Sequence, residues 1–124
     1  MINYFFAICA GVSGLILLLH MFAGSPNIAN PMRNCEELHP VVRETNYYCW
    51  HLVSISLLQL SISFGWAAIA PSAYLVAVIA VFTAFAFSIW GMVLVVTIRQ
   101  KFQYMPQGLL FLPLALIGLA GLLQ

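Results

Sequence analysis

Hydrophobic residues run through this chain in long stretches that no charged residue interrupts. The first stretch extends from Asn3 to Phe22, and another, from Thr45 to Ile98, contains no Asp, Glu, Lys or Arg. A helix needs roughly 20 apolar residues to cross the hydrocarbon core of a bilayer, which is about 30 Å thick. As one helix the longer stretch would measure about 80 Å. It must therefore fold back, and Pro71 in the segment "AIAPSAY" marks the expected turn.

The pattern predicts an all-α membrane protein, a four-helix transmembrane bundle that forms a single domain over residues 1–124. The expected spans are residues 3–22, 47–69, 73–97 and 106–123. The last span contains Pro113, and neighbouring helices can tolerate a kink there in lipid. Because the N-terminal run has no positively charged leading region, we interpret it as a retained helix rather than a cleaved signal peptide.

A long polar connection, residues 23–46, is expected between the first two spans. It holds Pro26, Pro31 and Pro40 and every acidic residue of the chain. Such a length is unusual between packed helices. Within it, the segment "NPMRNCEEL" predicts a short helix on the membrane surface, with Asn30 as its cap and Pro31 in its first turn.

Composition supports a bilayer as the environment. Of the 124 residues, 64% are hydrophobic and 6% are charged, whereas an ordinary soluble domain carries about 25% charged residues. So few charges would not cover the surface of a soluble fold. The net charge of +1 gives no field that would attract nucleic acid.

The few basic residues predict an orientation. Arg33 and Arg43 lie in the first connection, and Arg99 and Lys101 lie in the third. With four spans these two connections share one membrane face. The excess of basic residues on cytoplasmic loops therefore predicts that loops one and three are cytoplasmic and that both termini are outside.

Small residues form a stripe along the third span. Close packing of helices in lipid favours such residues at contact faces. We interpret the stripe as a seam against another helix. Its members are Ala73, Ala77, Ala80, Ala84, Ser88 and Gly91.

The second span has polar residues on two opposite sides. Gln59, with Ser56 and Ser63, lies on one side, and His51 and Ser54 lie on the other. An unpaired amide near the middle of a membrane is costly. Gln59 is therefore interpreted as a hydrogen-bonding contact between helices, or alternatively as a contact to a cofactor or a partner subunit.

A candidate ligand site lies near one membrane face. The first two spans are antiparallel, so His20 and His51 can sit at similar depth, with Met21 and Cys49 in the same layer. These side chains are possible ligands for copper or zinc, and the two histidines are possible axial ligands for haem b. The alternative is structural: the neighbouring aromatic residues are typical of a membrane interface, where a histidine need only bond a carbonyl.

Three short segments carry a family resemblance: "HMFAGSP", "CWH" and "PQGLLFLPLALIGLAGL". They resemble a group of small bacterial four-helix inner-membrane proteins with a His followed by F-G-G, a Trp-His pair and a Pro-Gln pair. Here the F-G-G position reads Phe-Ala-Gly. The resemblance implies a bacterial inner-membrane location and no particular activity. The positions that it favours are His20, Gly24, Trp50, His51 and Gln107.

Three functions fit this sequence. The first is a non-catalytic accessory subunit or assembly factor of a larger membrane complex, with other membrane subunits or copies of itself as partners. The second is a haem- or metal-binding membrane protein that uses His20 and His51. The third is a small transporter of a neutral solute. An enzyme is disfavoured because Glu36, Glu37 and Glu44 are the only carboxylate side chains.

Overall fold

The computed structural model describes residues 1–124 and is all-helical. The elements are α1 (Tyr4–Leu19), the π-helix η1 (His20–Ala29), α2 (Asn30–Arg33), α3 (Pro40–Ile69), the 3-10 helix η2 (Pro71–Ala73), α4 (Tyr74–Thr97) and α5 (Gln107–Leu122). Three helical stretches are long and apolar enough to cross a membrane: Tyr4–Arg33, Pro40–Ile69 and Pro71–Thr97. The remaining apolar helix, α5, has 16 residues and is shorter.

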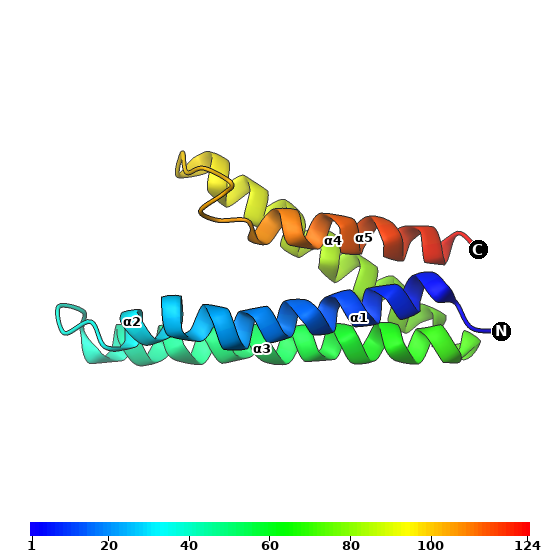
Figure 1. Cartoon of the computed structure of the whole chain (residues 1–124), viewed down its shortest axis with the longest axis horizontal. Helices are drawn as coiled ribbons and strands as arrows, with labels where there is room; N and C mark the ends of the chain where they lie inside the picture. Colours follow the sequence, from blue (N-terminus) through cyan, green and yellow to red (C-terminus); the bar gives the residue numbers. More distant parts are fainter.

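The helices form two hairpins. The α1 and α3 helices lie side by side over their length, and α4 and α5 form a second pair that packs on the first near the chain termini (Figure 1). Away from the termini the two hairpins diverge. The core lies where they meet, around the fully buried side chains of Phe64 and Leu114.

The connection between the first two long helices is much shorter than expected. The first helix continues beyond Leu19 as η1 and α2 and ends at Arg33, and α3 already begins at Pro40. The predicted long loop is therefore wrong. The helix predicted in "NPMRNCEEL" is present only as the four residues of α2, with Pro31 in its first turn, and it continues η1 directly. Pro26 lies inside the π-helix, whose amides pair with carbonyls five residues back. In an α-helix the ring of a proline clashes with the carbonyl four residues back, and the wider π turn moves that carbonyl away from the ring.

Chain reversal after α3 occurs at Pro71. The α3 helix ends at Ile69, and Ala70 has extended backbone angles of φ −122° and ψ 102°. A single 3-10 turn then leads into α4. Pro71 is the first residue of that turn, where a backbone amide would have no acceptor within the helix, so its missing N–H costs no hydrogen bond.

The small residues of α4 face the rest of the chain. Ala77, Ala80, Ala84 and Ser88 are all at most 3% exposed. Further along, Gly91 meets Gly108 of α5 at backbone distance, since a Cβ atom at Gly108 would lie 2.6 Å from the amide nitrogen of Met92. The hydroxyl of Ser88 donates a 2.9 Å hydrogen bond to the Gly108 carbonyl. The stripe thus lies against α5 in the structure.

Asn3 closes the opposite end of the bundle. Its side-chain oxygen caps α1 by accepting hydrogen bonds from the amides of Phe5 and Phe6. Its side-chain nitrogen donates to the carbonyl of Gly121, at 3.0 Å, and its own amide donates to the carbonyl of Ala68, at 2.9 Å. One residue therefore connects the ends of α1, α3 and α5.

The close contact between α4 and α5 predicts that a methyl group added at Gly108 destabilises the protein. Gly108→Ala should lower the free energy of unfolding by about 1–3 kcal/mol, because the new Cβ meets backbone that cannot move aside. Unfolding in mild detergent, followed by far-ultraviolet circular dichroism, measures this change.

Gly11→Ala is the matched control. A Cβ atom at Gly11 meets nothing within 4 Å, so this helix-interior substitution should be neutral or stabilising by up to about 1 kcal/mol. Equal effects of the two substitutions would contradict the proposed contact.

Candidate functional site

The histidine predicted at the end of the first span contacts the tryptophan at the start of the second. The rings of His20 and Trp50 stack with centroids 3.9 Å apart and planes at 16°. His20 is the first residue of η1, so the change of helix type occurs where the two rings meet. Wide π turns are rare in proteins, and those that do occur are frequently found at functional sites.

A second contact determines which nitrogen of the neutral His20 ring carries the proton. Nε2 of His20 lies 3.2 Å from the carbonyl oxygen of Trp50. A carbonyl oxygen can only accept, so the nitrogen that faces it carries the proton. In the neutral ring Nδ1 then holds the free lone pair, and this atom is the one available to accept a hydrogen bond or to bind a ligand.

The π-helix provides the space for the tryptophan ring. A Cβ atom at Gly24 would lie 2.8 Å from two atoms of the Trp50 six-membered ring. The indole Nε1 donates a 3.2 Å hydrogen bond to the hydroxyl of Ser25. We call the residues His20, Gly24, Ser25 and Trp50 the Trp50 clasp, because together they fasten the first helix to α3.

The other predicted ligands each make a different contact. The thioether sulfur of Met21 accepts a 3.2 Å hydrogen bond from the Ser54 hydroxyl beside the clasp. His51 contacts the ring of Tyr47, with centroids 4.6 Å apart, and Cys49 is exposed. Three or more His, Cys, Asp or Glu side chains do not gather anywhere in the chain. The predicted haem, copper or zinc site remains a sequence-based prediction.

A charged layer continues from the clasp toward the end of the hairpin. Arg33 of α2 forms an ion pair with Glu44 of α3 at 3.4 Å. The Arg33 guanidinium also lies 4.1 Å from the ring centroid of Tyr47, which in turn contacts His51. Exposed ion pairs contribute about 0–1 kcal/mol to stability. These contacts therefore help to orient α2 on α3 but add little to the free energy of unfolding.

Gln59 lies in a separate place, on a groove between α3 and α4. The groove has a volume of about 420 Å³. Ser56 and Thr83 also line it, and each donates its hydroxyl hydrogen bond to a carbonyl of its own helix. The carboxamide of Gln59 is exposed and has no partner within the chain. The second polar side of α3 therefore faces an open groove beside α4 and not the core.

The family resemblance favours both Gly24 and Trp50, but nothing in the sequence predicts that Trp50 contacts Gly24 and Ser25 directly. The spacing of His20 and Gly24, four residues apart, indicates only that these two share one helical face. Gln107, which the family resemblance also favours, begins α5 and lies beside Gly91. It belongs to the contact between α4 and α5 and not to the clasp.

Comparison of the sequence with protein-family models gave no match, and neither curated proteins nor solved structures gave one.

The clasp predicts that a methyl group at Gly24 displaces the tryptophan. Gly24→Ala should lower the free energy of unfolding by about 1–3 kcal/mol. Combining it with Trp50→Phe should cost less than the sum of the two single changes, because the smaller ring leaves room for the methyl group. Chemical unfolding of the four proteins in detergent measures the coupling.

Gly65→Ala serves as a control, because the nearest atom to its added Cβ is the Ala10 Cβ at 3.8 Å, an ordinary contact. Strict additivity of Gly24→Ala and Trp50→Phe would show that the two residues do not share the clasp.

Proposed function

We propose that the chain is a non-catalytic accessory subunit or assembly factor of a larger membrane complex in the bacterial inner membrane. It would contribute a rigid helical hairpin to which another subunit binds. The proposal rests on one observation above all, the unpartnered far end of the hairpin formed by α1, η1, α2 and α3.

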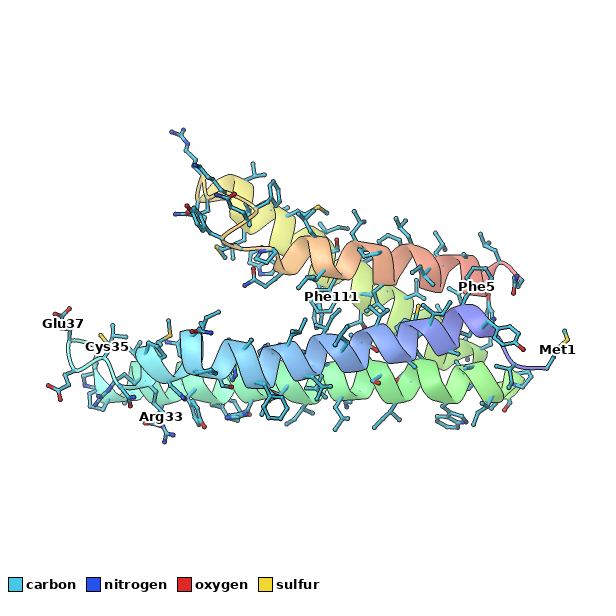
Figure 2. The ribbon with its side chains drawn as sticks, viewed as in Figure 1. Met1, Phe5, Arg33, Cys35, Glu37 and Phe111 are labelled. Atoms are coloured by element: carbon cyan, nitrogen blue, oxygen red, sulfur yellow. The ribbon has the colours of Figure 1, made fainter.

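This end extends beyond the rest of the bundle. The stretches Tyr4–Arg33 and Pro40–Ile69 each have 30 residues and so measure about 45 Å, longer than the roughly 30 Å hydrocarbon core. Arg33, Cys35 and Glu37 lie at the far end of the hairpin, where α4 and α5 have diverged from it (Figure 2). Several turns of paired helix therefore stand free of the second hairpin.

The free end is held in one arrangement. The Trp50 clasp fastens η1 to α3, and the ion pair of Arg33 with Glu44 fastens α2 to the first turns of α3. A preorganised surface loses less conformational entropy when a partner binds. The end of the hairpin thus has the rigidity expected of a docking element.

The free end also presents a contact surface. A shallow hollow of about 440 Å³ lies along the start of α3, lined by Pro40, Val41, Glu44, Thr45 and Tyr48. Val41 is 66% exposed and Tyr48 is 63% exposed. Tyrosine is enriched at the centres of protein interfaces and among the residues that dominate binding energy.

The same proposal includes four membrane spans, with α5 as the fourth. At 16 residues α5 measures about 24 Å, and its end is level with the end of α1 through the hydrogen bond of Asn3 to Gly121. Arg33 and Arg43 would then share one face with Arg99 and Lys101. That face is proposed to be cytoplasmic, with both termini outside.

Extraction of the full-length chain from its native membrane with mild detergent tests the function. A particle that contains a second, stoichiometric polypeptide is expected. Tyr48→Ala should reduce recovery of that polypeptide by about tenfold or more, since it removes an exposed aromatic side chain from the hollow.

Leu116→Ala is the control, because Leu116 is 51% exposed on α5, in the other hairpin. It should leave recovery unchanged. A particle that holds only copies of this chain would overturn the proposed function.

A further inference from the structure

A regular row of side chains follows the side of α3 that borders the groove between α3 and α4. The row is Leu52, Ser56, Gln59, Ser63 and Trp66, spaced by four, three, four and three residues. At about 100° per residue these positions share one side of the helix. This spacing is the heptad pattern of helices that pair with a second helix.

The row is only partly covered by the bundle to which it belongs, since Ser56 and Ser63 are half-buried beside α4. Gln59 is exposed, Leu52 is 42% exposed and Trp66 is 55% exposed. The packed side of α3 lies opposite, where the Ser61 hydroxyl donates a 2.9 Å hydrogen bond to the carbonyl of Ala10. The row therefore forms one wall of an open groove, and α4 forms the other wall.

The amide of Gln59 indicates what kind of surface belongs there. A carboxamide offers two donors and one acceptor, and leaving them unpaired in lipid is costly. Gln59 lies near the middle of the uncharged part of α3, so a partner must present a hydrogen-bonding group at that same depth.

We propose that the occupant is a second copy of this chain, with the two α3 helices packed in parallel about a twofold axis along the membrane normal. Such an axis brings each residue opposite its own copy at the same depth. Gln59 then meets Gln59, and a carboxamide is complementary to another carboxamide. No foreign helix needs to supply a matching amide.

The shape of the face agrees with this pairing. Ser56 and Ser63, one turn on either side of Gln59, are small enough to let two helices approach closely. Ser56 already bonds the Leu52 carbonyl of its own helix, so its burial leaves no unpaired hydroxyl. Ile79 and Thr83 of α4 line the other wall of the groove. In the dimer, one side of the second α3 packs against this wall.

Disulfide cross-linking in lipid vesicles tests the proposal. The full chain is used with Cys35→Ser and Cys49→Ser, because Cys9 is buried and does not react across chains. Ser63→Cys should cross-link efficiently to a second chain. Leu58→Cys, at similar depth and 48% exposed but about 100° from Gln59 around the helix, should not.

Substitution of the amide gives an independent measurement. Gln59→Leu should raise the dimer dissociation constant in vesicles by about tenfold, measured by energy transfer between labelled chains. Gln59→Asn keeps an amide and should lose less. Ser56→Ala should leave the dissociation constant unchanged, because its hydroxyl bonds within its own helix.

Three outcomes would overturn the inference. They are a monomer at all protein-to-lipid ratios, equal cross-linking at residues 58 and 63, and a Gln59→Leu dimer as stable as the original. A photoreactive residue at position 63 that couples to lipid or to a different protein in the native membrane would also overturn it. None of these results depends on whether the hairpin end binds another subunit.

Discussion

The arrangement of this bundle depends on how closely the backbones of α4 and α5 approach each other. In lipid, apolar side chains gain little by leaving lipid tails for another helix, so close packing and hydrogen bonds decide which helices associate. At Gly91 and Gly108 the two backbones touch, and the Ser88 hydroxyl bonds the α5 carbonyl at the same place. This contact orients α5 so that Leu114 reaches the core. The second hairpin then packs on the first through further close contacts, of Gly118 with Phe64 and of Gly121 with Phe6.

Much of the helical architecture could be predicted, because it rests on long uncharged runs and on small residues repeated at helical spacing. The error concerned the predicted connection of residues 23–46, of which residues 23–33 and 40–46 are helical. Pro26 and Pro31 are local signals for a loop, yet the helix continues through both. What stabilises it there is the indole of Trp50, which lies against Gly24 and donates to Ser25 from another helix. A contact between segments 25 residues apart leaves no mark in the local pattern.

The sequence predicts that His20 and His51 lie at the same end of their helices, but it does not predict which way their rings point. Antiparallel neighbours had to bring His20 close to His51, because both lie near the same end of their spans. Whether each ring faced the other, a carbonyl or an aromatic ring depended on side-chain orientation, which sequence spacing does not give. The same limit applied to α3. Its two polar sides were evident, but only the packing of α1 and α4 shows that one side bonds α1 and that the Gln59 side lines an open groove beside α4.

The contacts of Asn3 bear on the order in which the bundle can assemble. This residue is made before its partners Ala68 and Gly121, which follow 65 and 118 residues later. During synthesis the first hairpin can pair once α3 has been made, because its contacts lie within that half of the chain. The amide of Asn3 must wait for the end of α5. The earliest residue of the bundle is therefore among the last to reach its final surroundings, and its side chain reports whether the final helix has docked.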